Sequence, residues 1–596
     1  MRVFGPTQCT PAMVLLSLET PSALSATKPR VLDQWLINPR EGAQRVFVSE
    51  HVKTELMAWM MCTRSDASHL GGVAGLYFAM SDAGAARVLV QGPVGSQARV
   101  TALREFVRRK HPALDVRDFA HGDVLRVGNR LTCHPVHLAS SPLPPAAEGG
   151  CVWCHPRPAS PAAASVASPA HAATCLMLNV DDGKCVVLVV DCCSDIEALR
   201  LPMHRVLVEP CPVHALRIVV HLASASTCAS AAYRTWVDSL PSSVEEHVYA
   251  HTLRSSLASS DALLRENRQR LPRLFPQTES ASREPVAVIN LFAQPLCRTV
   301  VASSDVARGD AGANAQADIE IDSAELPTES CVVVLGSGAA KPSTLRGLSA
   351  LHVWFDASRS ALLDVGEATV WQMERAYGAA NVQRAIDSLE LVWVSHAHLD
   401  HHGGLLLVLQ MRSVTGNPLT VVAPHAIGRL LAAACNGDDV NRYTFVPCGE
   451  AWSVPGLSSV PADHCPDAHS VAVDWTLDDG TPVRLVYSGD TRGRSPALAR
   501  LKDSSRRIVL VHEATFEDAL AEEARAKAHS TVADAARAAL ALGASALLLT
   551  HQSQRYAIKL PEADVARAVK ALPGCAVLDA HDLMRVSVAA AVRGDL

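Results

Sequence analysis

An internal repeat limits what this chain can fold into more than any other feature of its sequence. Five pairs of segments match in the same order at a spacing of roughly 300 residues, which indicates a duplicated unit. The pairs are Trp35–Asn38 and Leu362–Val365, Thr63–Met80 and Val394–Met411, Arg87–Pro93 and Leu419–His425, Asn179–Cys193 and Thr476–Asp490, and Val219–Ser224 and Leu510–Thr515. In both copies, short apolar runs typical of buried strands alternate with helix-like runs. The 596 residues would allow about four domains at roughly 150 residues each, but the repeat predicts two large α/β units.

Two compositionally biased segments lie outside the repeated pattern. Residues 277–329 are rich in Ser, Ala, Asp, Glu and Gly and have little periodic apolar pattern, which is typical of a linker. Residues 139–173 are rich in Pro, Ala and Ser, which is typical of a mobile insertion. We therefore expect a first domain at residues 1–276 with an insertion at about 99–173, a linker at 277–329 and a second domain at 330–596.

The composition excludes several classes of protein. Apolar residues make up 48% and charged residues 19% of the chain, which excludes wholesale disorder and collagen. No apolar run approaches the roughly 18 residues that a membrane span requires, so we expect no membrane partner. The 17 Cys have no regular spacing, which fits a reducing compartment rather than a disulfide framework. The net charge of −6 implies that a nucleic acid would have to meet a local basic patch.

The second copy carries a dense group of metal-ligand side chains that the first copy lacks. Four donors lie within six residues, directly after the apolar run Leu389–Val394, which we expect to be a buried strand. They are His396, His398, Asp400 and His401. A turn at a strand end can direct these side chains toward one point. Around its matching Gly-Gly pair the first copy keeps only Ser65, Asp66 and His69, so we expect that copy to be degenerate.

Three further residues complete a candidate metal site if they lie on the same face of the sheet. His464, Asp490 and His551 each follow an apolar run that reads as a strand. Taken alone, each is more often an ordinary loop residue, but together with the His-rich segment they indicate a site. Mixed His and carboxylate ligands suit Zn²⁺, with Mn²⁺ or Fe²⁺ as alternatives, and seven donors are too many for one tetrahedral ion. Two ions about 3.5–4 Å apart that share Asp490 would use all seven.

Further motifs surround this site, at His512–Phe516, at His529–Thr531, at Thr550–Tyr556, and at Gly336–Gly338 followed by Pro342–Arg346. The ligand pattern resembles the metallo-β-lactamase superfamily, and these motifs resemble those of tRNase Z (ribonuclease Z), the endoribonuclease of that superfamily that matures tRNA 3′ ends. A linker between a catalytic half and a degenerate half is similar to the long form of the family. The resemblance implies two metallo-β-lactamase-fold domains, each an αβ/βα sandwich, with the N-terminal one degenerate. It also implies two Zn²⁺ ions, one bound by His396, His398 and His464 and the other by Asp400, His401 and His551, with Asp490 bridging them; Mn²⁺ is a candidate substitute.

The resemblance implies removal of the 3′ trailer from precursor tRNA, leaving a tRNA 3′-hydroxyl and a 5′-phosphate on the trailer. Asp400 beside the metals suits removal of a proton from the attacking water. His529, kept charged by Glu513, suits proton donation to the departing ribose oxygen. The alternative for this pair is a helix cap for the Ser530/Thr531 region and a surface acid. The alternative functions are another hydrolase of this fold, acting on DNA, mRNA or an ester, and a non-catalytic RNA-binding protein.

Substrate-binding residues are less well marked. Arg346 and Arg555 lie in the family-like motifs and are candidates for RNA contacts, although Thr344 and Gly347 stand where the family usually carries Lys and Asn. In the first half, the basic run Arg104, Arg108, Arg109 and Lys110 is a candidate for gripping tRNA, with a solvated helix face as the alternative. We expect a monomer whose two internal halves pack as a pseudo-dimer. We expect it in the nucleus, with the mitochondrion and cytoplasm as alternatives, because the first expected strand leaves little room for a targeting peptide.

Overall fold

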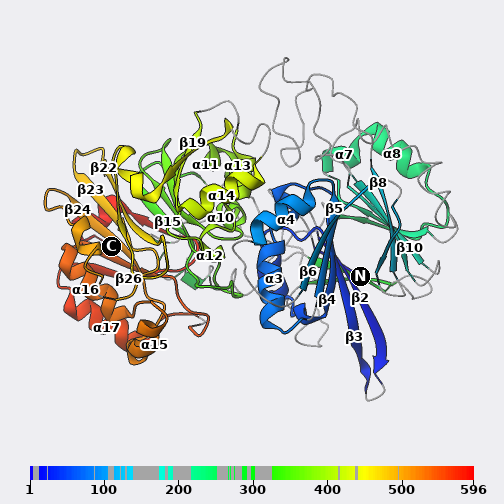
Figure 1. Ribbon diagram of the computed structural model, residues 1–596, viewed down its shortest axis with the longest axis horizontal. Helices are drawn as coiled ribbons and strands as arrows, with labels where there is room; N and C mark the ends of the chain where they lie inside the picture. The colour runs from blue at the N-terminus through cyan, green and yellow to red at the C-terminus, as the bar shows by residue number, and fades with distance from the viewer. Residues whose placement is uncertain are drawn as a thin grey trace. The chain divides into compact units, whose positions relative to one another are not determined.

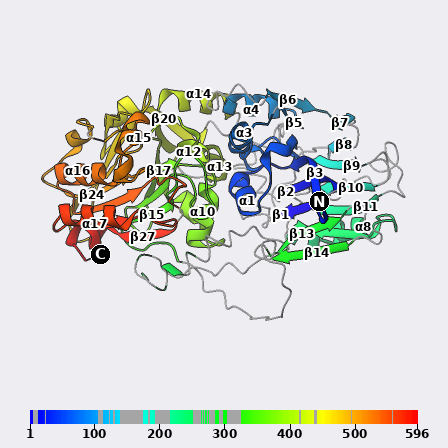
Figure 2. The same cartoon turned by 90° about the horizontal axis from the view of Figure 1, so that it is seen from below.

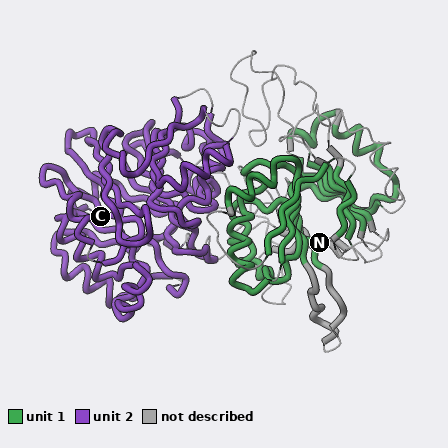
Figure 3. Tube along the Cα trace, in the orientation of Figure 1, with its two compact units in different colours: residues 1–258, 281–317 green, residues 259–280, 318–596 purple. Residues whose placement is uncertain are grey.

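A computed structural model describes most of the chain as two compact units. The described residues are 1–4, 13–22, 25–85, 87–104, 113–120, 123–127, 131–137, 174–180, 185–191, 216–223, 225–250, six positions between 263 and 274, 285–290, 297–302, 325–413, 417–435, 441–493, 495–556 and 558–595. Unit 1 comprises residues 1–258 and 281–317, and unit 2 comprises residues 259–280 and 318–596 (Figure 3).

Unit 2 contains two mixed β-sheets. The first has the order β20-β19-β18-β17-β16-β15-β27 and the second β21-β22-β23-β24-β25-β26 (Figure 1). The strands of the first sheet are β15 (Cys331–Gly336), β16 (Ala350–Trp354), β17 (Ser360–Val365), β18 (Leu389–Trp393), β19 (Leu419–Ala423), β20 (Tyr443–Pro447) and β27 (Met584–Ser587). Those of the second are β21 (Leu457–Pro461), β22 (His469–Thr476), β23 (Pro482–Tyr487), β24 (Arg507–Glu513), β25 (Ala546–Thr550) and β26 (Ala576–Asp579). Strands β17 to β20 run parallel, as do β23 to β26, so their carboxyl ends lie at one edge of each sheet.

Helices cover the outer faces of both sheets in unit 2. The α-helices are α10 (Thr369–Tyr377), α11 (Val382–Asp387), α12 (Leu399–His402), α13 (Leu405–Met411), α14 (His425–Ala434), α15 (Ala521–Ala526), α16 (Val532–Leu542), α17 (Glu562–Ala571) and α18 (Val588–Arg593), and the 3₁₀ helices are η8 (Cys448–Ser453), η9 (Leu498–Leu501) and η10 (Asp518–Leu520). Helix α10 packs on β15, whereas α16 and α17 pack on β25 and β26 (Figures 1 and 2).

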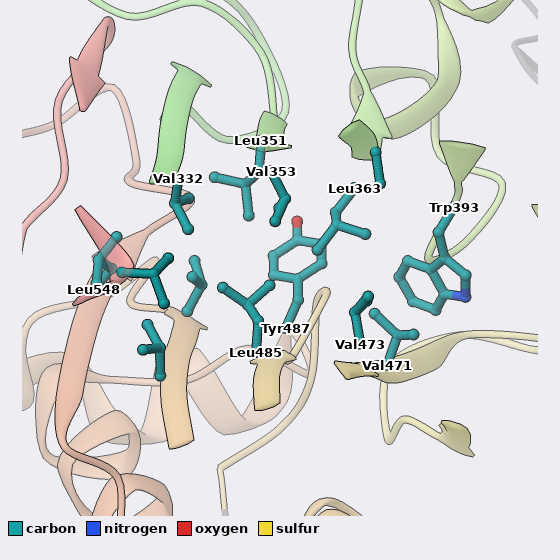
Figure 4. Close-up of a cluster of buried hydrophobic side chains, with 14 of the residues drawn as sticks. Val332, Leu351, Val353, Leu363, Trp393, Val471, Val473, Leu485, Tyr487 and Leu548 are labelled. Carbon is teal, nitrogen blue, oxygen red and sulfur yellow. The ribbon is translucent and has the colours of Figure 1, made fainter. Parts of the chain in front are cut away.

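The core of unit 2 lies between its two sheets. Figure 4 shows side chains from both sheets meeting there, among them Leu351 and Leu363 from the first sheet and Leu485 and Leu548 from the second. Each of these leucines is at most 2% exposed. Burial of this apolar surface drives the sheets together and fixes the strand ends that carry the polar side chains. Tyr487 lies in the same layer, and its hydroxyl donates to Asp364 at the carboxyl end of β17.

Unit 1 also contains two sheets. Their orders are β14-β13-β1-β2-β3-β4-β5-β6 and β12-β11-β10-β9-β8-β7. The strands of the first sheet are β1 (Arg2–Phe4), β2 (Met13–Ser22), β3 (Ser25–Ile37), β4 (Met57–Met61), β5 (Arg87–Pro93), β6 (Ala113–Phe119), β13 (Pro285–Asn290) and β14 (Cys297–Ala302). Those of the second are β7 (Leu125–Val127), β8 (Leu131–His137), β9 (Thr174–Val180), β10 (Cys185–Val190), β11 (Leu216–His221) and β12 (Glu246–Tyr249). The helices with described bounds are α1 (Ala43–Ser49), η1 (Thr54–Leu56), α2 (Ala67–Leu70), α3 (Val73–Asp82), α4 (Ser96–Arg104), α7 (Ala225–Ala229) and α8 (Ala231–Asp238).

The strand topology of the two units matches over most of both sheets. Strands β1 to β6 pair with one another as β15 to β20 do, with two antiparallel pairs followed by three parallel pairs. In the second sheet, β8 to β12 pair in the same antiparallel and parallel sequence as β21 to β25. The prediction of an α/β fold built from two copies of one unit is therefore confirmed.

The expected linker contains structure that the sequence analysis did not predict. Strands β13 and β14 lie within residues 277–329, and β13 pairs antiparallel with β1, as β27 pairs with β15 in unit 2. Their sequences, Pro-Val-Ala-Val-Ile-Asn and Cys-Arg-Thr-Val-Val-Ala, are rich in β-branched residues, which favour strands. The linker prediction rested on the polar residues that follow from Ser303, whereas residues 285–302, which contain both runs, are largely apolar. Within the expected insertion at about 99–173, the structure describes the end of α4 and strands β6, β7 and β8.

None of the helices in the described part of the chain is both long enough and apolar enough to cross a membrane.

Candidate metal centre and its surroundings

The seven predicted metal ligands come together at the carboxyl ends of the strands in unit 2. The His-rich segment links β18 to α12, and Leu389–Trp393 forms the buried strand that the sequence predicted. His464 lies between β21 and β22, Asp490 follows β23, and His551 follows β25. His551 has a φ of 55°, which is an uncommon conformation for a residue other than glycine. Strand ends from both sheets therefore supply the donors.

The first group of donors consists of His396, His398 and His464. The Nδ1 atom of His398 lies 2.8 Å from Nε2 of His396 and 3.2 Å from Nε2 of His464. Two nitrogens bound to one tetrahedral Zn²⁺ lie about 3.3 Å apart, which follows from Zn–N distances of about 2.0–2.1 Å. The spacing of these three nitrogens therefore fits a single metal ion. His396 is fully buried, whereas His398 is exposed, so this group opens toward solvent.

The second group consists of Asp400, His401 and His551. The Nε2 atoms of His401 and His551 are 3.2 Å apart, and Oδ2 of Asp400 lies 3.5 Å from the first and 3.4 Å from the second. Asp490 joins both groups. Its Oδ2 lies 3.7 Å from Nε2 of His396 and 3.4 Å from Nε2 of His401, and its Oδ1 lies 3.3 Å from Nε2 of His551. Asp490 is thus in the position that a bridging ligand requires.

The chemistry of the donors supports metal binding. The Oδ1 atom of Asp490 is buried and has no hydrogen-bond partner among the described residues, which is costly for a carboxylate oxygen unless a cation neutralises it. Burial alone would lower the pKa of His401, but Asp490, Asp400 and Asp364 raise it well above its usual value. Burial and repulsion from His401 hold the pKa of His396 far below its usual value, which keeps this histidine neutral. Buried carboxylates that hold the pKa of His401 high, beside a neutral His396, make an environment in which a divalent cation can replace the ring proton as the balancing charge.

Hydrogen bonds outside the donor groups fix which nitrogen of each histidine faces inward. Asp364, with a φ of 57°, accepts from Nδ1 of His401 at 2.7 Å. The Nδ1 atom of His464 lies 2.9 Å from the carbonyl oxygen of Ala528, and that of His396 lies 2.9 Å from the hydroxyl of Ser395. The Nδ1 protons of these rings are therefore directed away from the site, and their Nε2 lone pairs are directed into it.

Glu513 and His529 form a pair next to these donors. The Glu513 carboxylate is fully buried and accepts four hydrogen bonds, two at each oxygen. The donors are the backbone N–H of Thr491 and Nδ1 of His529 at Oε1, and the hydroxyl of Thr515 and the backbone N–H of Ser530 at Oε2. Burial opposes a charge on His529, but attraction to Glu513 and the 3.1 Å hydrogen bond raise the pKa of His529 to about 9. His529 is therefore protonated at neutral pH and can donate a proton.

The structure confirms one half of the alternative assignment, a helix cap in the Ser530/Thr531 region, and contradicts the other half, a surface acid. The cap of α16 is Thr531, whose hydroxyl accepts from the backbone N–H of Asp534. Glu513 is not on the surface, and its carboxylate bonds to the backbone of Ser530 rather than to the first turn of the helix.

The matching position in unit 1 contains ion pairs instead of a donor group. Alignment of Gly71-Gly72 with Gly403-Gly404 places Arg64 where unit 2 has His396. The Asp191 carboxylate lies 3.1 Å from Nε of Arg64 and 3.3 Å from Nε2 of His69, and Asp66 lies 2.7 Å from Nδ1 of His69. All four side chains are at most 4% exposed. Two cations thus balance two carboxylates, and in the described residues of unit 1 no three metal-ligand side chains bring one ligand atom each to within 4.8 Å of one another.

The predicted RNA-binding residues fall into different environments. Arg346 is only 3% exposed, and its guanidinium donates to the hydroxyl of Ser337 and to the carbonyl oxygens of Ala580 and Ile558. It therefore holds its own loop, and the prediction that it contacts RNA is corrected. Arg555 is partly exposed, and its guanidinium lies 5.1 Å from the centre of the Phe516 ring. Arg104 ends α4 but its side chain is not described, and Arg108, Arg109 and Lys110 lie outside the described residues.

Several residues of the site were not singled out from the sequence. Asp364, Ser395, Thr515 and Tyr487 supply the outer hydrogen bonds, and Cys465 lies near the first donor group, with its sulfur within 4.8 Å of the ligand atoms of three histidines. One signal was available for Asp364. The repeat pairs a polar residue at the end of the matching strand in each copy, Asn38 and Asp364, and both have a φ of 57°.

Comparisons with known proteins agree with this arrangement. Residues 353–552 match the model of the beta-lactamase superfamily domain. The chain is 33% identical over 298 residues to the mitochondrial tRNase Z TRZ3 of Arabidopsis thaliana, covering 39% of this chain and 33% of that protein. It is 32% identical over 253 residues to the mitochondrial ribonuclease Z of Drosophila melanogaster, covering 38% of this chain and 32% of that protein. The chain thus matches about a third of the length of these curated relatives.

One solved structure is similar over nearly the whole chain. The crystal structure of a long form RNase Z from yeast matches with a TM-score of 0.73 and 16% identity, covering 98% of this chain and 97% of that one. At this identity the match concerns the fold. Together with the matching strand topology of the two units, it confirms the prediction of an α/β fold with two similar domains, and the beta-lactamase superfamily model matches the second of them; among the described residues, unit 2 alone carries the donor groups.

Proposed function

We propose that this chain is a zinc-dependent endoribonuclease that removes the 3′ trailer from precursor tRNA. The observation that carries the proposal is the combination of seven metal ligands with a protonated histidine, His529, held by a buried carboxylate in the same site. A metal-dependent hydrolase needs both parts when the leaving group is an alkoxide. The relatives named tRNase Z and ribonuclease Z support precursor tRNA as the substrate.

We assign the metal ligands to two ions. His396, His398 and His464 would hold one ion, Asp400, His401 and His551 the other, and Asp490 would bridge them. When bound, two zinc ions would activate a water molecule at neutral pH and stabilise the charge on the attacked phosphate; Mn²⁺ is a candidate substitute. The exposed position of His398 supports an approach of the scissile phosphate from that side.

The remaining steps belong to side chains of the protein. The Oδ2 atom of Asp400 accepts the backbone N–H of Ala340 at 2.7 Å, and we assign Oδ1 to take the proton from the attacking water. The Nδ1 atom of His529 is bonded to Glu513, so Nε2 is the atom that we assign to protonate the departing ribose 3′ oxygen. The products would be a tRNA with a 3′-hydroxyl and a trailer with a 5′-phosphate.

Contacts with the rest of the tRNA are assigned to other parts of the chain. The partly exposed Arg555 is the candidate contact near the site, and the run Arg104, Arg108, Arg109 and Lys110 remains the candidate in the first half. The names of the two relatives support a mitochondrial location; the nuclear location, like a monomer in which the two halves pack together, stays a prediction.

A comparison of substrates tests this function. The purified chain with Zn²⁺ is incubated separately with a 3′-extended tRNA transcript, a single-stranded DNA and a small-molecule phosphodiester. Cleavage of the tRNA transcript alone is the expected result. Cleavage of the DNA or the ester in preference to tRNA would support another hydrolase of this fold, and binding of tRNA without cleavage would support a non-catalytic RNA-binding protein.

A further inference from the structure

The hydroxyl of Thr515 connects a predicted metal ligand to the proton-donating pair. Thr515 follows β24 and is 5% exposed. Its Oγ1 lies 2.6 Å from Oε2 of Glu513 and 2.8 Å from Nδ1 of His551. Glu513 is completely buried and His551 is 2% exposed, so water does not compete for these contacts. The sequence motif that contains Thr515 did not indicate this contact with His551.

The direction of both hydrogen bonds follows from the partners of Glu513. This carboxylate already accepts the backbone N–H groups of Thr491 and Ser530 and the ring of His529, and an ionised carboxylate can only accept. The single hydroxyl hydrogen of Thr515 is therefore donated to Glu513. Its oxygen must then accept from His551, which places the ring proton of His551 on Nδ1.

The consequence for His551 is a fixed orientation and a fixed tautomer. With its proton on Nδ1, the lone pair on Nε2 is directed to the point where Oδ1 of Asp490 and Nε2 of His401 lie 3.3 Å and 3.2 Å away. A hydrogen bond from the second nitrogen of a metal-binding histidine orients the ring and raises its basicity as a ligand. Without the hydroxyl, neither the tautomer nor the ring angle of His551 would be set.

The other donor group contains the same device. The hydroxyl of Ser395 lies 2.8 Å from Oδ2 of Asp364 and 2.9 Å from Nδ1 of His396. Asp364 also accepts from His401 and Tyr487, so the serine hydroxyl donates to the carboxylate and accepts from the histidine. Each of the two donor groups therefore contains a histidine whose Nδ1 donates to a hydroxyl, and that hydroxyl donates in turn to a carboxylate that already accepts other hydrogen bonds.

We propose that Thr515 is a positioning residue that orients His551 for the metal held by Asp400, His401 and His551 and couples that ligand to Glu513 and His529. The metal held by His396, His398 and His464 does not depend on this hydroxyl. The inference rests on the proposed function only for the effect on cleavage, because the effect on metal binding can be measured without any RNA.

Titration of the zinc-loaded protein with a chelator tests the proposal. Thr515→Val removes the hydroxyl with little change in shape, and Thr515→Ser keeps it. Thr550→Val is the matched control, because Thr550 is a buried threonine beside His551 whose side chain makes none of these bonds. We expect Thr515→Val to bind one of its two zinc ions about 10–100-fold more weakly than wild type, so that the chelator removes this ion first. Thr515→Ser and Thr550→Val should bind both ions about as tightly as wild type. The proposal would be overturned if Thr515→Val bound both zinc ions as tightly as wild type, or if it weakened the binding of both ions by the same factor. Failure of Thr515→Ser to keep the wild-type affinity would also overturn it.

A second measurement does not depend on the folding of a variant. In metal-free wild-type protein labelled at the histidine nitrogens, we expect Nδ1 of His551 to carry a proton that is hydrogen-bonded to Thr515, and an Nδ1 without a proton would overturn the proposal. Selective loss of one zinc in Thr515→Val together with no cleavage of precursor tRNA by the wild type would contradict the proposed function while supporting the role of Thr515. Cleavage by the wild type together with unchanged zinc affinity in Thr515→Val would support the proposed function and contradict the role of Thr515.

Discussion

Glu513→Gln is the substitution that most sharply separates a structural from a chemical role of the buried pair. The carboxylate accepts four hydrogen bonds, two at each oxygen. The glutamine NH₂ group can only donate. If it replaces Oε1, the backbone N–H of Thr491 loses its acceptor, and if it replaces Oε2, the backbone N–H of Ser530 does. An unsatisfied buried donor costs about 1–3 kcal/mol, and loss of charge weakens the remaining bonds further. We therefore expect unit 2 to lose about 2–5 kcal/mol of unfolding free energy.

The same substitution should slow cleavage beyond what the loss of stability explains. Glu513 raises the pKa of His529 to about 9, and without the negative charge a smaller fraction of His529 is protonated at neutral pH. Loss of a general acid typically costs about 10²–10⁴-fold in rate. Native-state hydrogen exchange in β24 would measure the stability, and cleavage of 3′-extended tRNA by folded protein would measure the rate.

Glu562→Gln is the matched control, because this carboxylate is 79% exposed and pairs only with the exposed Lys559 among the described residues. We expect it to stay within about 0.5 kcal/mol of wild type and to cleave at the wild-type rate. The reasoning would be refuted if Glu513→Gln were as stable and as active as this control.

Three further predictions concern unit 1 and the loop of Arg346. His69→Ala should leave the zinc content unchanged, because ion pairs replace the donor group in unit 1; loss of zinc, measured by elemental analysis, would contradict this. Burial lowers the pKa of His69, but Asp66 and Asp191 raise it to about 9, which is above the unfolded value of about 6.5. Protonated His69 therefore stabilises unit 1 fully below pH 6.5, and this stabilisation is lost as the pH rises through 9. The protection factors of the α2 amides, which are corrected for the base-catalysed rise of intrinsic exchange, should therefore fall over that interval in wild type but not in His69→Asn, and equal pH dependence of the two would count against the assignment. Arg346→Met should destabilise unit 2 by about 1–3 kcal/mol in denaturant unfolding, because the hydroxyl of Ser337 and the carbonyl oxygens of Ala580 and Ile558 lose a charged donor; weaker tRNA binding with unchanged stability would restore the RNA-contact role.

The ligand set could be predicted because each ligand lies at the carboxyl end of a strand that the apolar pattern marks. Parallel strands bring these ends to one edge, so His464, Asp490 and His551 could be grouped although they are far apart in the sequence. The outer hydrogen bonds could not be predicted in the same way. Whether Thr515 reaches His551 depends on side-chain directions that β-strand periodicity does not determine.

Arg346 illustrates a second limit of the sequence. Its motif identifies a cation in a loop, but the same side chain can bind RNA or hold the loop, and burial among Ser337, Ala580 and Ile558 decides between them. Strands β13 and β14 illustrate a third limit. Each is only six residues long, which is too short for periodicity alone to identify a strand, and the polar sequence that follows from Ser303 gave residues 277–329 the composition of a linker.

Mapping the ends of the cleavage products tests the central claim most directly. A 3′-extended tRNA transcript is incubated with wild-type protein and with His398→Ala in the presence of Zn²⁺, and both product ends are sequenced. The account predicts one cut on the 3′ side of the discriminator nucleotide, a 3′-hydroxyl on the tRNA, a 5′-phosphate on the trailer, and loss of this cut in His398→Ala. No cut by the wild type, a cut elsewhere, or a cut that His398→Ala leaves unchanged would contradict it.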